Sequence, residues 1–474
     1  MKRIAILLAA AMLLAVLAAC GGAPEDTGVS PVDDDTPFDW PENKQVEQKN
    51  ESLTIYSMDV GKGTEMLKNA VTLFRASHLG VQIELIVEDY SNGNDNYINY
   101  QKVAAEIMAG KGPDILLIEE TEIDVEKAVR QGVFADMEPF FKADGFDWEP
   151  YNQTILDGGV WDGRRYVIPL SYDFPLLVST RTALEETGFD VDACRDYNGF
   201  LEETRRVMED SSQTRPLFFN HLSALVTNWM MEYSGVRYAN YNNQTIDLSR
   251  PEVKATFEWR RAYEERYDSE IIGMAGLYAA AAVRDGEALW AANLSGAAGT
   301  LFFDYAALKT IDEPVMMPIR DVNGGIQAQL EYPVAVRANS ENLQNAYDFL
   351  KILLSKEVQG VYAGQYGGER LSVLNQVNTD YYYHSAIWVR PGDWYSYRAG
   401  TQGFTSTRNP AISTDWPTEE EYAQFTDLIQ EITGTYYSSS LRLVGAMRPF
   451  IYDGVDYDEA VQDAQRTLEI SISE

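Results

Sequence analysis

Several residue types are scarce in this chain of 474 residues. It has two cysteines, Cys20 and Cys194, and three histidines, His78, His221 and His384. The histidines lie far apart in the sequence and lack the paired spacing of zinc ligands. Neither a phosphate-cradling glycine loop with lysine nor a Gly-x-Ser-x-Gly elbow occurs. We therefore expect no metal, no cofactor and no catalytic residues.

Positive charge is also scarce. The chain has 38 Lys and Arg against 73 Asp and Glu, which gives a formal net charge of -35. Such a surface repels nucleic acid and anionic lipid headgroups and keeps a protein soluble. We expect no nucleic-acid partner and a monomer.

Long apolar runs are absent from the body of the chain, so it is not expected to cross a membrane. One shorter run lies at the start, where Lys2 and Arg3 precede residues 4–19. This pattern predicts a secretory signal over residues 1–19. Its end, Leu17-Ala18-Ala19-Cys20, resembles the lipobox of bacterial lipoproteins, in which the cysteine is acylated and becomes the first mature residue. We expect a protein anchored through lipid (palmitate) on Cys20 to the cell membrane, facing outside, with no intrachain disulfide.

The segment after Cys20 is rich in Gly, Pro, Asp, Glu and Gln and poor in large apolar residues. Because such a composition buries little apolar surface, residues 20–52 are predicted to be the lipid anchor and a flexible tether.

Alternating strand and helix patterns begin after the tether. Residues 53–58, 81–87 and 115–118 read as strands, and residues 64–77 and 97–108 read as helices. Strand–helix–strand units of this kind predict an α/β fold with a parallel sheet.

The rest of the chain is more mixed. Further strands are predicted at 166–169, 176–179, 300–303 and 315–336, a helix at 341–354, and an aromatic-rich loop at 376–418 that lengthens or covers a cleft.

Five segments resemble the family 1 extracellular solute-binding proteins, the carbohydrate-binding receptors of ABC importers. Residues 104–115 resemble the family's block of a helix, an Ala-Gly pair and then Pro-Asp-Ile. Residues 132–139 resemble its stretch of a glycine, apolar residues, an acidic residue and a proline. Residues 161–169 match a Gly-x-x-Tyr-x-x-Pro crossing strand, 346–359 a helix ending in Ser-x-Glu-x-Gln, and 458–469 the C-terminal helix. The matches run through nearly the whole mature chain in the family's order.

The resemblance implies a type II periplasmic-binding-protein-like clamshell, in which two lobes close on ligand about hinge strands. Lobe 1 is then expected at 53–171 plus 309–371, and lobe 2 at 172–308 plus 372–474. The chain would cross between lobes near Ser171, Leu308 and Leu371.

Ligands of open α/β sheets bind beyond the carboxyl ends of the strands. That rule selects polar and aromatic residues that follow predicted strands. They are Ser57, Asp59, Lys62, Glu119, Glu120, Tyr172, Asp173, Phe174, Asp304 and Tyr305. Carboxylates accept sugar hydroxyls and flat rings stack on pyranoses, so these residue types suit a carbohydrate. The competing interpretation is that the acidic residues are helix caps or solvated edges.

Four further aromatic residues are candidates for stacking on a ligand: Trp229, Trp290, Trp394 and Tyr397. For Trp229 and Trp290 a place in a helix core or a packed strand entry is the competing interpretation.

Together these features predict a lipid-anchored substrate-binding protein that captures an oligosaccharide and delivers it to ABC permease subunits. Three alternatives stay open: the same fold with a non-sugar solute such as a polyamine or peptide, a sugar receptor for a membrane kinase, and a surface glycoside hydrolase. A hydrolase needs two carboxylates about 5–10 Å apart across one cleft.

Overall fold

A computed structural model gives the structure of the chain. It describes residues 38–58, 61–87, 102–103, 105–118, 123–218, 230–267, 279–293, 297–365, 370–380, 394–395, 412–413, 415–438 and 442–473.

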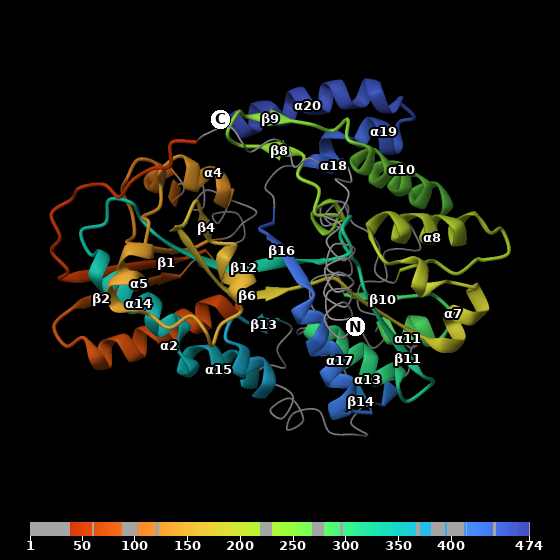
Figure 1. Ribbon diagram of the computed structural model, residues 1–474, viewed down its shortest axis with the longest axis horizontal. Coiled ribbons are helices and arrows are strands. Elements are labelled where there is room, and N and C mark those ends of the chain that lie inside the picture. The colour runs from red at the N-terminus through yellow and green to blue at the C-terminus, as the bar shows by residue number, and fades with distance from the viewer. Residues whose placement is uncertain are drawn as a thin grey trace, which may run out of the picture.

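The described residues form two α/β lobes side by side, with long strands running between them (Figure 1). The first lobe contains the N-terminal strands, and the second contains most of the middle and C-terminal helices. This two-lobed α/β architecture confirms the predicted fold class.

The first lobe is built on a mixed seven-stranded sheet with the path β13-β6-β12-β3-β1-β2, in which β16 also pairs with β12. Strand β1 pairs in parallel with β2 and β3, as expected for strand–helix–strand units. Its strands are β1 (Ser52–Ser57), β2 (Gln82–Val87), β3 (Ile115–Leu117), β6 (Val167–Asp173), β12 (Ile326–Val336), β13 (Leu371–Ser372) and β16 (Ile432–Tyr436). The described part of the lobe also contains the hairpin β4 (Val160–Trp161) and β5 (Arg164–Arg165) and the helices α2 (Lys62–Ser77), α4 (Val125–Arg130), α5 (Glu138–Asp144), α6 (Gln153–Asp157), α14 (Leu343–Leu354) and α15 (Lys356–Gln365).

The second lobe surrounds a three-stranded antiparallel sheet, β10-β7-β11. Its strands are β7 (Leu176–Thr180), β10 (Ala291–Asn293) and β11 (Pro314–Pro318), with the ribbons β8 (Ala239–Asn240) with β9 (Thr245–Ile246), and β14 (Trp394–Tyr395) with β15 (Ile412–Ser413). The helices are α7 (Arg181–Thr187), η2 (Val191–Ala193), α8 (Tyr197–Glu209), α10 (Pro251–Arg266), α11 (Ala279–Arg284), α12 (Ala297–Gly299), the π-helix η4 (Thr300–Tyr305), α13 (Ala306–Leu308), α17 (Glu419–Gln430), α18 (Leu443–Ala446), α19 (Arg448–Tyr452) and α20 (Tyr457–Ser473).

The chain passes between the lobes through β6, β12 and β13. Ser171 in β6 pairs with Ser372 in β13, beside Leu371, near two of the predicted crossings. Leu308 instead lies inside the second lobe in α13, and the following strand β11 pairs with β7. The segment after Leu308 therefore stays in the second lobe, and the chain returns to the first sheet only through β12. The boundary expected at residue 309 is corrected accordingly.

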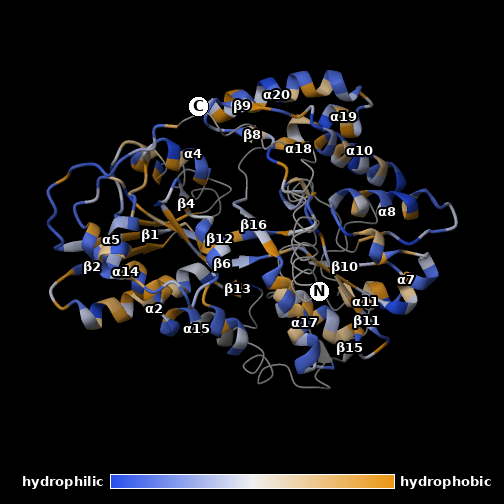
Figure 2. Ribbon diagram, viewed as in Figure 1, coloured by the Kyte–Doolittle hydropathy of each residue, from blue (hydrophilic) through white to orange (hydrophobic). Residues whose placement is uncertain are grey.

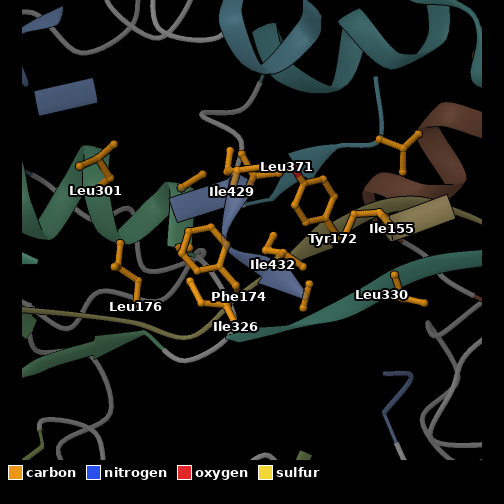
Figure 3. Packing of buried hydrophobic residues seen from close by; sticks show 14 of the residues in the cluster. Ile155, Tyr172, Phe174, Leu176, Leu301, Ile326, Leu330, Leu371, Ile429 and Ile432 are labelled. Carbon is orange, nitrogen blue, oxygen red and sulfur yellow. The ribbon is translucent and has the colours of Figure 1, made fainter. Parts of the chain in front are cut away.

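A continuous apolar core fills the region where the lobes join. Tyr172 and Phe174 of the crossing strand pack with Ile155, Leu330 and Ile432, and all five side chains are buried (Figure 3). Apolar residues gather in the strands and on the inner helix faces, while the outer helix faces are mostly hydrophilic (Figure 2). A second core cluster joins α10, α18, α19 and α20 at the C-terminal end of the second lobe.

Residues 38–50 lie in an extended path along the first lobe, where the red end of the described chain runs in Figure 1. Asn43 exchanges hydrogen bonds with the backbone of Asp136, at 2.8 and 2.6 Å. Gln48 donates to the carbonyl of Ser340 and accepts from the backbone N–H of Leu343. The predicted flexible tether is therefore wrong for residues 38–50. The prediction relied on the small number of large apolar residues, whereas polar side chains of this segment hold it to the first lobe by hydrogen bonds.

The predicted strands 53–58, 81–87 and 115–118 and the helix 64–77 are confirmed within one or two residues by β1, β2, β3 and α2. The predicted strand at 300–303 is wrong, since those residues belong to a π-helix. The helix expected from residue 341 begins at Leu343.

The predicted loop at 376–418 is also more regular than expected. It contains helical residues up to Asp380 and the paired strands β14 and β15. Within the described ranges no helix combines the length and the apolar character that a membrane crossing requires.

Candidate functional site

A cleft of about 800 Å³ lies between the two lobes, within the usual range for small-molecule sites. The first lobe contributes the start of α4, the end of α6 and the β4–β5 hairpin, and the second contributes residues 232–241. Strands β12 and β16 form the part of the cleft where the lobes join. Six aromatic residues line it: Trp40, Trp161, Tyr238, Tyr241, Tyr436 and Tyr437. Five carboxylates do so as well: Asp124, Glu126, Asp157, Asp162 and Glu232.

Trp161 is held in the cleft by a tight hairpin turn. It pairs with Arg164 across Asp162 and Gly163, which have φ values of +50° and +72°. Asp-Gly is a favoured pair for the two-residue turn that needs positive φ at both positions. The ring of Trp161 lies nearly parallel to that of Tyr437, with 6.4 Å between ring centres and 18° between planes. These two rings of the first lobe thus form an aromatic wall.

Asp124 joins the lobes across the cleft. Its side chain accepts a hydrogen bond from the backbone N–H of Lys127 at 2.9 Å and so caps α4. Its second oxygen accepts a hydrogen bond from the hydroxyl of Tyr241 in the second lobe. Burial, and next the charge of Asp124, raise the pKa of Tyr241 well above its usual value, so the phenol stays protonated and donates.

Glu232 has a strongly altered acidity. Burial is the main cause that raises the pKa of Glu232 to about 8, with further contributions from Asp124 and Glu126. The nearby Arg237 opposes the shift without cancelling it. Glu232 is therefore largely protonated near neutral pH, when its carboxyl group can both donate and accept hydrogen bonds.

Helix α6 and the strands β12 and β16 approach each other closely where they line the cleft. A Cβ atom on Gly158 would lie 2.5 Å from a methyl of Leu330 and 2.6 Å from the hydroxyl of Thr435. Only glycine at the end of α6 permits this contact with β12 and β16. Strand β12 also carries Tyr332 at a φ of +52°, which is unusual for a bulky residue and marks a strained point in the crossing strand.

The structure places the predicted residues at the strand ends in the interior. The hydroxyl of Ser57 is buried and lies 2.7 Å from that of Thr64, and Lys62 begins α2 with a buried Nζ. Asp173 is 1% exposed and accepts hydrogen bonds from the backbone N–H groups of Phe174, at 2.9 Å, and Ala297, at 2.6 Å.

The neighbours of Asp173 are equally enclosed. The hydroxyl of Tyr172 accepts a hydrogen bond from Asn378, and Phe174 stacks on Phe425. The carboxylate of Asp173, at the end of β6, thus accepts the N–H of the first residue of α12, which agrees with the structural role that the competing interpretation gave it.

Three more predicted residues lie in the second lobe. Trp290 is fully buried and packs edge-on against Phe189. Asp304 accepts a hydrogen bond from the backbone N–H of Ala280 at 3.2 Å, and burial raises its pKa to about 7. Tyr305 is 4% exposed. None of the eight predicted residues that the structure describes with side chains lines the cleft.

The remaining predicted residues fall outside the described part of the chain. They are Cys20, Asp59, Glu119, Glu120, Trp229 and Tyr397. For Trp394 the structure describes the backbone in β14 and not the side chain.

Among the described residues of the cleft, sequence reasoning considers only Trp161, in its turn, as a possible ligand contact and does not include it among the predicted binding residues. Trp161 carried a usable signal, an aromatic residue immediately before an Asp-Gly turn. Trp40, Tyr241 and Tyr437 carried none, because segments far apart in the sequence bring them together.

The fold and the cleft between its lobes define a two-lobed binding protein of the type II class. The sequence model of the bacterial extracellular solute-binding proteins matches residues 60–360. The chain belongs to this family.

Solved structures with the same fold include sugar-binding proteins. The cyclic alpha-maltosyl-1,6-maltose binding protein of Arthrobacter globiformis is 14% identical, with a TM-score of 0.54 over 89% of this chain and 98% of that one. An ABC substrate-binding protein of Listeria monocytogenes in complex with cycloalternan is 12% identical, with a TM-score of 0.53 over 90% and 100%. A chitin oligosaccharide binding protein is 19% identical, with a TM-score of 0.53 over 89% and 99%. At these identities the likeness shows the fold alone. The chain has no significant match among curated protein sequences.

Proposed function

We propose that this protein captures an oligosaccharide in the cleft between its lobes and delivers it to the permease of an ABC importer. The cleft, with rings and carboxylates from both lobes, carries the proposal. Trp161 and Tyr437 offer flat apolar faces to a sugar ring, and polar groups beside them offer hydrogen bonds to its hydroxyls.

Closure of the lobes supplies the mechanism. A ligand that contacts Trp161 of the first lobe and residues 232–241 of the second binds the closed state more tightly than the open state. It thereby shifts the equilibrium toward the closed state, and the size of the shift is set by the difference between its affinities for the closed and the open state. The permease subunits then recognise the closed form. We further propose that a monomer acts from the outer face of the membrane, held by lipid on Cys20, without turning over its ligand.

A cationic ligand is the second candidate, because the charge of the cleft favours it. Five carboxylates line the cleft, and among its described lining residues the only Arg or Lys is Arg237. A polyamine or an amino sugar would find acceptors on both lobes.

The test is thermal unfolding of the protein without residues 1–20 against a panel of ligands. The panel contains malto-, manno- and chito-oligosaccharides, the polyamine spermidine and a short peptide. A ligand at one hundred times its dissociation constant stabilises the folded state by about 2.7 kcal/mol. We expect an upward shift with one oligosaccharide series, and we expect chromatography to recover that sugar unchanged after long incubation.

The other outcomes separate the alternatives. A rise of the unfolding temperature with spermidine alone would indicate a cationic ligand instead of a sugar. A rise with the peptide alone would also exclude a carbohydrate ligand. Cleavage of the sugar would indicate a hydrolase.

A further inference from the structure

The segment that precedes the first strand, residues 38–50, reaches the cleft between the lobes. We call this segment the strap. Its residue Trp40 lines the cleft together with Trp161 and Tyr437, although it lies outside both lobes in the sequence. The strap is also the part of the described chain nearest in sequence to the predicted membrane anchor.

The strap is fixed to the first lobe immediately after Trp40. The hydroxyl of Tyr166 donates a hydrogen bond of 2.8 Å to the carbonyl of Pro41. Pro41 lies so close to Gly132 that a Cβ there would be 3.0 Å from the proline ring, and Gly132 has a φ of +68°. Asn43 adds its two hydrogen bonds to Asp136. The position of Trp40 therefore does not depend on a ligand.

A cation holds the ring of Trp40 in place. The guanidinium of Arg130 lies 4.8 Å from the ring centre of Trp40 and 5.0 Å from that of Phe38. Arg130 is in turn paired at 2.5 Å with Glu126, which also lines the cleft. Contacts of a cation with aromatic faces stabilise such an arrangement by about 0.5–2 kcal/mol.

The aromatic rings form a row that leads away from the junction of the lobes. Tyr437 is followed by Trp161, then by Tyr166, then by Trp40, each ring centre 6.4 Å from the next. Tyr166 is buried, at 1% exposed, whereas Trp40 is only partly buried. Trp40 thus lies at the outer end of the row, two rings beyond the pair of Trp161 and Tyr437.

We propose that Trp40 is a ligand-binding residue and that the strap forms the outer sugar subsite of the cleft. This inference rests on the proposed function. A short sugar reaches only the wall made by Trp161 and Tyr437, while a longer one extends to Trp40. The strap therefore determines the length of oligosaccharide that the protein prefers.

The experiment compares sugars of two lengths on matched variants. Calorimetric titration measures the affinity of the wild type, Trp40→Ala, Trp40→Phe and Gln45→Ala. The probes are the disaccharide and the hexasaccharide of whichever malto-, manno- or chito- series the wild type binds. Gln45→Ala is the control, since Gln45 is an exposed residue of the same strap and does not line the cleft.

We expect Trp40→Ala to weaken hexasaccharide binding about tenfold, with little effect on the disaccharide. Trp40→Phe should restore most of the loss, and Gln45→Ala should bind both sugars like the wild type. Unchanged hexasaccharide affinity in Trp40→Ala would overturn the inference, as would an equal loss for both sugars or an equal loss in Gln45→Ala. If the wild type binds no sugar of any series, the proposed function fails first and this inference fails with it.

Discussion

The cleft and the interior of the protein contain the same kinds of side chains, carboxylates and aromatic rings, which differ in how far they are exposed to water. In the interior, Asp173 is enclosed and accepts two backbone hydrogen bonds, and Trp290 is packed against Phe189. In the cleft, Asp162 is exposed and Trp161 is partly exposed beside Tyr437. Residue type alone therefore does not identify a binding residue. What separates the two regions is how far the polar atoms and ring faces are exposed to water.

The largest effect is expected from Asp173→Ala. The change leaves the buried N–H groups of Phe174 and Ala297 without their acceptor, and each such loss costs about 1–3 kcal/mol. We expect the free energy of unfolding to fall by about 3 kcal/mol, measured by urea denaturation. Asp162→Asn in the cleft is the control and should change stability by less than about 0.5 kcal/mol. Equal effects of the two changes would remove the distinction between the regions.

The next effect is the pH dependence that Asp304 imposes on stability. Its pKa is raised by burial to about 7, whereas an unfolded aspartate titrates near about 3.9. Between these values the folded protein holds a proton that the unfolded chain has lost, so stability falls as pH rises from about 4 to 7.

Asp304→Asn should remove that fall. We expect the variant to resemble the wild type at pH 4 and to be more stable than the wild type at pH 8, as measured by urea denaturation at each pH. A variant that is less stable than the wild type at pH 8 would show that the charged carboxylate is favourable in the fold.

A smaller effect of the same sign is expected in the cleft at Glu232, whose pKa is raised to about 8. Stability is full below about pH 4 and declines as pH rises toward 8, and Glu232→Gln should flatten this decline. Because Glu232 is only partly buried and water screens it, we expect a difference of about 1 kcal/mol at pH 9. Thermal unfolding across the pH range measures it. A variant with the same pH dependence as the wild type would contradict the raised pKa.

The smallest effect is expected from Tyr241→Phe, which removes the hydrogen bond between the second lobe and Asp124 of the first. A hydrogen bond to a charged group contributes about 1.5–3 kcal/mol, and the exposure of both groups to water on opening reduces its net effect to about 1 kcal/mol. We expect a more open average shape and therefore a larger radius of gyration in small-angle scattering. The wild-type radius in the variant would show that this contact does not restrain the lobes.

The sequence allowed prediction of those parts of the fold that local periodicity determines. Alternating and helical spacing of apolar residues identified β1, α2, β2 and β3. The run at residues 300–303 was misread because a short apolar segment has the same composition in a buried strand and in a buried helix.

The cleft was beyond prediction for a different reason. Its walls come from a hairpin turn, the strap and residues 232–241, which meet only through tertiary contacts. The rule of strand ends led instead to Ser57 and Asp173, which the fold uses for its own hydrogen bonds.

The most direct test of the central claim is calorimetric titration of Trp161→Ala and Trp290→Phe with the oligosaccharide that stabilises the wild type. Trp161 lines the cleft, whereas Trp290 is fully buried in the second lobe. We predict that Trp161→Ala loses about 2 kcal/mol of binding free energy, roughly thirtyfold in affinity, and that Trp290→Phe binds like the wild type. Unchanged affinity in Trp161→Ala, or a loss confined to Trp290→Phe, would contradict binding in the cleft between the lobes.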